Sequence, residues 1–273
     1  MFGLSIFSTV FYQFTLEEAI RRTSKAGYKG IDLMAVRPHA WPNDYTKSER
    51  KDMLKRLKSV NLEVPTVTNF GAAIGLNPSS PKEKIRKEAI DYLKDCIDLA
   101  YDLESKTAML IPGWFLLGDS PEKAWKWAVE GLKECLDHAE DKSITIAIEP
   151  ALNLFDSVES VIRMKKEVGS KNIRICLDTL HTALDLKTTL EDSISKVAHE
   201  LVHFHVWDID AKGQHVPFGK GKLDFNKIVT ALKRSGYNGY LSVECMPFAF
   251  GISDPDEYAR ESKKFLFEIM RNL

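Results

Sequence analysis

The sequence predicts an α/β fold, a (β/α)8 TIM barrel of eight parallel strands and eight helices. Short runs rich in aliphatic and β-branched residues recur along all 273 residues, and an amphipathic segment follows each run. This alternation, with short connections, is typical of parallel strands joined by right-handed crossovers. The first strand is followed by Ser8-Thr9-Val10 rather than by the Gly-rich loop of a doubly wound open sheet. Because no Pro/Gly/Ser-rich linker divides the chain, we expect residues 1–273 to form one domain.

The predicted strands are short and nearly continuous in apolar residues, as expected for strands buried on both faces. In chain order they are 4–7, 30–34, 63–68, 106–111, 145–149, 173–178, 201–206 and 240–244. The amphipathic segments between them predict helices over 15–26, 48–60, 81–103, 120–141, 157–168, 190–198, 226–235 and 254–272.

Several helix ends carry their own start and stop signals. Thr15 precedes the first helix with Glu18 three residues later, which is a capping-box pattern. Gly27 and Gly236 each follow a helix at the position where a left-handed residue is favoured. The surrounding runs 26–30 (AGYKG) and 235–239 (SGYNG) are near-copies, which is a weak internal repeat marking the turn from helix to strand.

The composition excludes several classes of protein. Lys and Arg number 38 against 39 Asp and Glu, so the net charge of -1 favours neither nucleic-acid binding nor an anionic membrane surface. The 44% hydrophobic content is typical of a globular domain, and no run approaches the roughly 20 apolar residues of a membrane span. The first residues lack the basic segment and cleavage site of a signal peptide. The cysteines are scattered without CxxC pairs, which excludes a zinc finger and favours reduced thiols in the cytoplasm.

Four of the later strands end in polar residues that could do chemistry. These residues are Glu149, Asp178, His205 and Glu244. In a parallel barrel, the carboxyl ends of the strands meet at one mouth, so three carboxylates and an imidazole would converge there. A single strand-end carboxylate is most often a helix cap or a salt-bridge partner, but three carboxylates close together repel one another and need a compensating positive charge. One divalent metal ion is the expected cofactor: Mn²⁺, Mg²⁺ or Co²⁺ is favoured by the oxygen-rich set, and Zn²⁺ is compatible with it.

The strand over 201–206 carries two histidines, His203 and His205. We expect only one of them to point into the barrel. His205 is the expected ligand, and His203 is the expected packing residue.

Beyond these positions, the sequence resembles a known group, the sugar-phosphate isomerase/epimerase family of xylose isomerase-like barrels. That group includes ketose 3-epimerases, hydroxypyruvate isomerases, inosose-processing enzymes and, more distantly, endonuclease IV. The resemblance spans the whole chain in element order. The most specific motifs are IEP at 148–150, DTLH at 178–181, HFHVWD at 203–208, HVPFGKGKLDF at 215–225 and GYNGYLSVE at 236–244.

The resemblance implies a role for each of these positions. Glu149, Asp178, His205 and Glu244 match the metal ligands of the family. Glu149 and Glu244 match the two acid/bases that move a proton next to a carbonyl through a metal-stabilised enediolate. The implied substrate is a small-molecule sugar: a ketose, a keto sugar acid or a ketose phosphate. His181 matches a substrate contact in the family.

Specificity depends on loops that depart from the family pattern. Ketose 3-epimerases similar to this chain carry an Arg four residues after the strand-5 glutamate and another six residues beyond the metal histidine, and this chain has Asn153 at the first position and Ala211 at the second. Trp114 and His215 are candidate substrate-binding residues, and Arg37 would suit an anionic substrate. An aromatic ring such as that of Trp114 can stack on the apolar face of a sugar or pack in the core.

Three alternatives stay open at this point. A dehydratase of the inosose type needs nearly the same residues. An endonuclease IV-like phosphodiesterase needs extra histidines, which the ends of strands 63–68 and 106–111 do not supply, and the net charge of -1 fits DNA poorly. A non-catalytic metal-binding or sugar-binding barrel would not require two opposed glutamates. Similar enzymes are often dimers or tetramers, so a homo-oligomer is compatible with the resemblance, although no sequence feature defines an interface.

Overall fold

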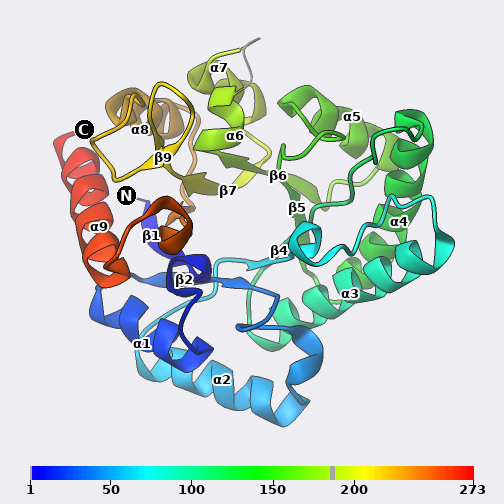
Figure 1. Cartoon of the computed structure of the whole chain (residues 1–273), viewed down its shortest axis with the longest axis horizontal. Coiled ribbons are helices and arrows are strands. Elements are labelled where there is room, and N and C mark those ends of the chain that lie inside the picture. The colour runs from blue at the N-terminus through cyan, green and yellow to red at the C-terminus, as the bar shows by residue number, and fades with distance from the viewer. Residues whose placement is uncertain (1, 185–187) are drawn as a thin grey trace.

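Eight parallel strands close into a barrel in the computed structural model, which describes residues 2–184 and 188–273 (Figure 1). Their order around the barrel is β1-β10-β7-β6-β5-β4-β3-β2, so barrel strands that are consecutive in the sequence lie side by side. The strands are β1 Gly3–Phe7, β2 Gly30–Met34, β3 Val67–Thr68, β4 Thr107–Met109, β5 Thr145–Ile148, β6 Ile173–Asp178, β7 Leu201–Val206 and β10 Tyr240–Val243. The predicted (β/α)8 TIM barrel is therefore confirmed.

Helices surround this barrel as an outer ring (Figure 1). They are α1 Leu16–Lys25, α2 Lys47–Ser59, α3 Glu83–Asp102, α4 Pro121–Glu140, α5 Val158–Val168, α6 Thr179–Leu184, α7 Leu190–Val197, α8 Phe225–Arg234 and α9 Pro255–Asn272. All of them except α6 match a predicted helix to within two residues at each end. Among the described residues, no helix is both long enough and apolar enough to cross a membrane.

The helix ends follow the predicted chemistry with one difference. The Thr15 hydroxyl accepts a hydrogen bond from the Glu18 backbone N–H at 3.3 Å, but the Glu18 carboxylate pairs with Arg21 and Arg22 instead of completing a capping box. Complete boxes lie at α2, where Thr46 and Glu49 cap each other, and at α5, where Ser157 and Ser160 do so. Gly27, after α1, has a φ of +81°, the left-handed conformation expected of a residue that ends a helix.

Two strands, β3 and β4, are shorter than predicted by more than one residue, and nearby residues explain why. β3 has two residues, because Pro65 has no N–H to donate and Glu63 pairs with Gly30 only through an isolated bridge. β4 ends at Met109, and the Ile111 backbone N–H donates to the Asn69 side-chain oxygen at 2.6 Å rather than to a neighbouring strand.

The mouth of the barrel carries short elements that the sequence did not predict. Helix α6 begins directly after β6, and an antiparallel hairpin of β8 Asp208–Ile209 and β9 His215–Val216 follows β7. Four 3₁₀ helices follow other strands: η1 Ser8–Phe11, η2 Pro42–Asp44, η3 Gly71–Ile74 and η4 Pro247–Phe250. Elements this short contain too few residues for a periodic hydrophobic pattern.

The apolar core lies mainly between the strands and the helices. Alternate strand residues such as Ile146 and Ile148 of β5 are fully buried in this large outer cluster. The remaining positions face the barrel interior, where Met109, Ala147 and Cys176 form a separate small cluster. Polar side chains are buried as well, so the interior is not purely apolar.

Candidate metal centre

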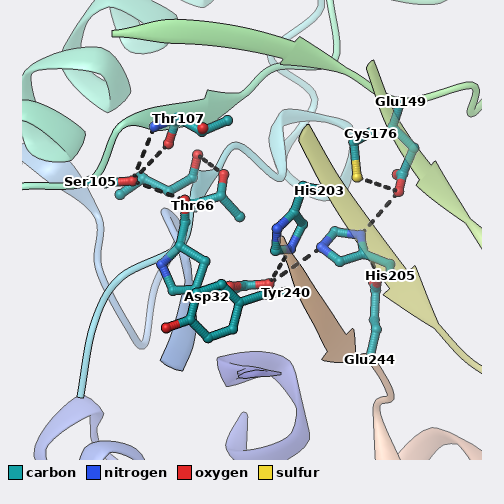
Figure 2. Close-up of polar contacts among 12 residues, drawn as sticks. Asp32, Thr66, Ser105, Thr107, Glu149, Cys176, His203, His205, Tyr240 and Glu244 are labelled. Atoms are coloured by element: carbon teal, nitrogen blue, oxygen red, sulfur yellow. Dashed lines mark hydrogen bonds and ion pairs between the residues drawn. The ribbon is translucent and has the colours of Figure 1, made fainter. Parts of the chain in front are cut away.

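The four predicted site residues come from four neighbouring strands of the barrel, β5, β6, β7 and β10. Glu149 directly follows β5, Asp178 ends β6, His205 lies near the end of β7, and Glu244 directly follows β10. Because parallel strands end at the same rim, the fold brings these side chains to one place. Figure 2 shows Glu149 and Glu244 approaching the His205 ring from different sides.

His205 is the centre of this group. Its Nδ1 lies 3.0 Å from a Glu149 oxygen and 3.1 Å from a Glu244 oxygen. Asp178 joins the group, since ligand atoms of Asp178, His205 and Glu244 all lie within 4.8 Å of one another. The His205 side chain is fully buried, and the Glu149 and Glu244 side chains are 6% and 12% exposed, so the group is nearly enclosed.

Asp178 has one oxygen held and one oxygen free. Its Oδ1 accepts a hydrogen bond from the His181 backbone N–H at 2.8 Å, which fixes the carboxylate at the start of α6. Its Oδ2 is buried and has no hydrogen-bond partner in the described part of the chain. A buried carboxylate oxygen without a partner is costly, which favours a ligand at this point.

The electrostatics of the group show an excess of negative charge. Burial raises the pKa of Asp178 to about 6, with repulsion from Glu149 adding to this and attraction to His181 opposing it. Burial also raises the pKa of Glu244 well above its usual range, and both neighbouring carboxylates add to the shift. Burial alone would raise the pKa of Glu149 as well, but its hydrogen bond and charge attraction to His205, together with attraction to His181, outweigh burial and lower it. A divalent cation would relieve the repulsion among the three carboxylates.

The donor set therefore fits a divalent metal. Three carboxylates and one imidazole are ligands for Mn²⁺, Mg²⁺ or Co²⁺, and they also suit Zn²⁺. One further donor is near: the Cys176 thiol lies 3.7 Å from Glu149 Oε1, on the strand face that also carries Asp178. Burial raises the pKa of Cys176 well above its usual range, and repulsion from Glu149 adds to this, so the thiol stays protonated. Sequence reasoning placed Cys176 in the core and missed its position beneath the site.

The expectation for His203 was wrong. Residues two apart on a strand point to the same face, so both His203 and His205 face the barrel interior. His203 Nε2 lies 2.7 Å from Asp32 Oδ2, and His205 Nε2 lies 3.6 Å from the same oxygen (Figure 2). Burial alone would raise the pKa of Asp32, but the two histidines outweigh it and hold that pKa well below its usual range. Asp32 was not among the predicted site residues, and the signal for it is a charged residue in the middle of the buried strand β2.

The two histidines predicted to bind substrate, His181 and His215, lie in different surroundings. His181 is part-exposed in the first turn of α6, close enough to Glu149 and Asp178 to lower the pKa of both. His215, in β9, is buried, and its Nε2 lies 3.0 Å from the thiol of Cys245. Burial lowers the pKa of His215 to about 4, so this ring is neutral at pH 7.

Arg37 and Trp114 lie in loops after β2 and β4. The Arg37 guanidinium is exposed and makes two hydrogen bonds to Asp44, at 2.7 and 2.5 Å. Trp114 is half-buried, and both its backbone N–H and its carbonyl are bound by the Asn77 side chain. The structure thus shows no contact between either residue and the metal-ligand candidates.

A buried carboxylate fixes the loop of the 215–225 motif. Asp208 Oδ2 accepts hydrogen bonds from the backbone N–H groups of Gly219 and Gly221, both at 2.9 Å. A Cβ atom at position 221 would lie 2.0 Å from Asp208 Oδ1, so only glycine fits there. The aspartate of the HFHVWD motif therefore supports the mouth of the barrel instead of binding in it.

Three comparisons relate this fold and site to known proteins. A family model described as xylose isomerase-like TIM barrel matches residues 20–269. Fructoselysine 3-epimerase from Shigella flexneri is 23% identical over 252 residues, which cover 90% of this chain and 90% of that protein. A solved structure of L-ribulose 3-epimerase has a TM-score of 0.84 at 21% identity, covering 100% of this chain and 95% of the other. The IOLI protein, crystallised with a bound zinc atom, has a TM-score of 0.81 at 18% identity, covering 99% and 98%.

Proposed function

Since the chain belongs to the xylose isomerase-like TIM-barrel family, we propose that it is a divalent-metal-dependent sugar isomerase or epimerase. The observation that carries this proposal is the meeting of Glu149 and Glu244 at His205, with Asp178 beside them. Two of the proteins it is similar to are named as 3-epimerases, which supports proton transfer next to a ketose carbonyl.

Glu149, Asp178, His205 and Glu244 would hold the metal ion. The unpartnered Asp178 Oδ2 and the raised pKa of Glu244 both indicate that the group is incomplete without a cation. The chemistry that such an ion supplies is polarisation of the sugar carbonyl and stabilisation of the negative charge that develops beside it.

Glu149 and Glu244 would move the proton. They lie three strands apart in the ring of eight and approach His205 from different sides (Figure 2). One carboxylate breaks the C–H bond and takes the proton, and the other, as a carboxylic acid, gives a proton to the opposite face of the same carbon. The carbon is then inverted, and the two glutamates have exchanged protonation states. A carboxylate that binds an ion through one oxygen can still use its other oxygen as a base.

The substrate in this proposal is a ketose, a keto sugar acid or a ketose phosphate. His181 would contact this substrate, because its part-exposed side chain lies beside Glu149 and Asp178. His215 is buried against Cys245, so its contribution would be to shape the mouth beside Glu244. Trp114 remains a candidate specificity residue, whereas Arg37 is already paired with Asp44, so its expected contribution is small.

The cellular location that fits this function is the cytoplasm, and the expected partner is the small-molecule sugar substrate. Cys96, Cys135, Cys176 and Cys245 are buried and unpaired, as expected in a reducing compartment. The phosphodiesterase alternative gains no support from His39, the histidine after β2. Its two ring nitrogens lie 3.0 Å from the Ser8 hydroxyl and 3.2 Å from the Phe14 carbonyl.

Proton exchange tests the proposal directly. We would incubate the chelator-treated protein, before and after adding Mg²⁺ or Zn²⁺, with a panel of ketoses, keto sugar acids and ketose phosphates in D₂O, and follow the carbons next to the carbonyl by proton NMR. The proposal predicts deuterium at one such carbon only when metal is present. Loss of water from the substrate would instead identify an inosose-type dehydratase, and cleavage of abasic DNA without sugar exchange would favour the phosphodiesterase.

A further inference from the structure

A second carboxylate lies on the far side of His205 from the metal-ligand candidates. Asp32, in the middle of β2, is fully buried, and its Oδ2 lies 3.6 Å from His205 Nε2. The opposite ring nitrogen, Nδ1, faces Glu149 and Glu244 (Figure 2). The His205 imidazole therefore stands between Asp32 inside the barrel and the ligand group at the mouth.

A neutral imidazole has one lone pair and one N–H, so its two nitrogens must take different roles. If Nδ1 supplies the lone pair to a metal, the proton must be on Nε2. His205 Nε2 is buried and has no hydrogen-bond partner within 3.5 Å among the described residues, and the acceptor it faces is Asp32 Oδ2. A movement of about half an ångström would bring this pair to hydrogen-bond distance.

Other contacts fix both the carboxylate and the ring. His203 Nε2 lies 2.7 Å from Asp32 Oδ2 and anchors the oxygen that His205 faces. The Phe7 ring stacks on His205 with the ring centroids 5.5 Å apart and the planes at 7°. The His203 ring meets His205 edge-on at 5.0 Å, so rotation of the His205 ring is blocked from two directions.

We propose that Asp32 is a positioning residue of the metal centre, accepting the Nε2 proton of His205 and so directing the Nδ1 lone pair to the metal. This role rests on the proposed function. Carboxylates that orient a ligating histidine typically change metal affinity about 10- to 100-fold when removed. Asp32 itself touches neither the substrate region nor Glu149.

The same residues allow one rival arrangement. Ligand atoms of Asp32, His203 and His205 lie within 4.8 Å of one another, so a second ion bound there is a geometric alternative. The two arrangements differ in stoichiometry, since the positioning role needs one metal per chain and the rival needs two.

The test compares Asp32→Asn with the wild-type full chain in a Co²⁺ titration that records affinity, stoichiometry and the visible d–d spectrum. We expect one Co²⁺ per wild-type chain, binding weakened about 10- to 100-fold in D32N, and a changed spectrum because the imidazole is no longer fixed. Asp208→Asn is the matched control. It also removes a buried carboxylate, one that binds Gly219 and Gly221, and should lower stability while leaving Co²⁺ affinity and spectrum unchanged.

Each other outcome overturns a defined part of the proposal. Unchanged affinity and spectrum in D32N would overturn the positioning role and leave the proposed function intact. Two Co²⁺ ions per wild-type chain, with one lost in D32N, would overturn it in favour of a second metal site. No Co²⁺ binding by the wild type would overturn the proposed function and this role together.

Discussion

The two halves of the barrel have the same backbone plan and different chemistry at their mouths. In one half, the ends of β5, β6, β7 and β10 carry the four metal-ligand candidates. In the other half, β1 to β4 end at Phe7, Met34, Thr68 and Met109, none of which is charged. The difference shows that the fold provides equivalent positions around the whole rim, and that the side chains assign the chemistry to one half.

The supports of the two halves differ in the same way. In the half that carries the metal-ligand candidates, which we call the chemical half, a buried carboxylate holds a loop: Asp208 accepts hydrogen bonds from the backbone of Gly219 and Gly221. Loops of the other half are held by buried amides, as Asn77 holds Trp114 and Asn69 holds Ile111. At these two points the second half is held by neutral groups, which do not compete for a metal ion.

The largest effect is expected from the two glutamates. Glu149→Gln and Glu244→Gln should each lower epimerisation about 10²- to 10⁴-fold, because each removes one of the two groups that move the proton. Deuterium exchange without inversion should survive for one epimer in each variant, and for opposite epimers in the two variants. NMR of both epimers in D₂O measures this.

Thr68→Val is the control from the neutral half. Its hydroxyl is buried and has no hydrogen-bond partner among the residues that the structure describes, so turnover should stay within about twofold. The comparison of halves would fail if T68V lost as much activity as either glutamate variant.

Asp178→Asn should separate function from stability. Metal affinity should fall by more than the roughly 10- to 100-fold typical of residues around a ligand. Metal-free protein should become more stable at pH 7, because the raised pKa of Asp178 means that its ionisation opposes folding above pH 6. The shift from 3.8 to about 6 corresponds to a gain of up to about 3 kcal/mol.

The sign of this effect can be checked by pH. Because the pKa of Asp178 is raised in the folded state, its ionisation leaves the free energy of unfolding unchanged below about pH 4 and lowers it by the full amount above about pH 6. The difference in unfolding free energy between D178N and wild type should therefore grow over that range. Urea unfolding of chelator-treated proteins measures it. A difference that stays constant or shrinks with pH would contradict the charge excess inferred for the site.

Gly221→Ala tests the support of the chemical half. The added Cβ would lie 2.0 Å from Asp208 Oδ1, so the loop must shift, at a cost of about 1 to 3 kcal/mol in unfolding free energy. Gly118→Ala, in the neutral half, is the comparison, since its added Cβ meets nothing within 4 Å and its cost comes from a φ of +96° alone. If thermal unfolding showed the larger loss in G118A, the Asp208 contact would not be the constraint.

The smallest effect is expected at Arg37. Its guanidinium is exposed and already paired with Asp44, so Arg37→Ala should change turnover less than about fivefold for neutral and phosphorylated ketoses alike. Steady-state kinetics on both substrate types measures this. A loss confined to the phosphorylated substrates would show that Arg37 recognises an anion, as the sequence suggested.

The sequence predicted those features that a local pattern within one segment of the chain encodes. Glu149 and Asp178 stand out because each ends an apolar run, and the strand and helix order follows from the alternation of patterns. Asp32 and Cys176 were missed because they lie inside strands, where only the register shows that they face His205 and Glu149.

Other features depend on contacts that no local pattern encodes. β3 is short because of Pro65, and Arg37 is occupied because the turn at η2 brings back Asp44 seven residues later. His203 was misplaced for a different reason, since its spacing from His205 already required the same strand face. The four site candidates could thus be named from the sequence, whereas the side chains packed behind them could not.

The measurement that tests the central claim most directly is an anomalous-difference map from crystals grown with Mn²⁺. The account predicts a single peak among Glu149, Asp178, His205 and Glu244, with His205 Nδ1 facing it. A peak between Asp32 and His203 instead, or no peak beside these four residues, would contradict it.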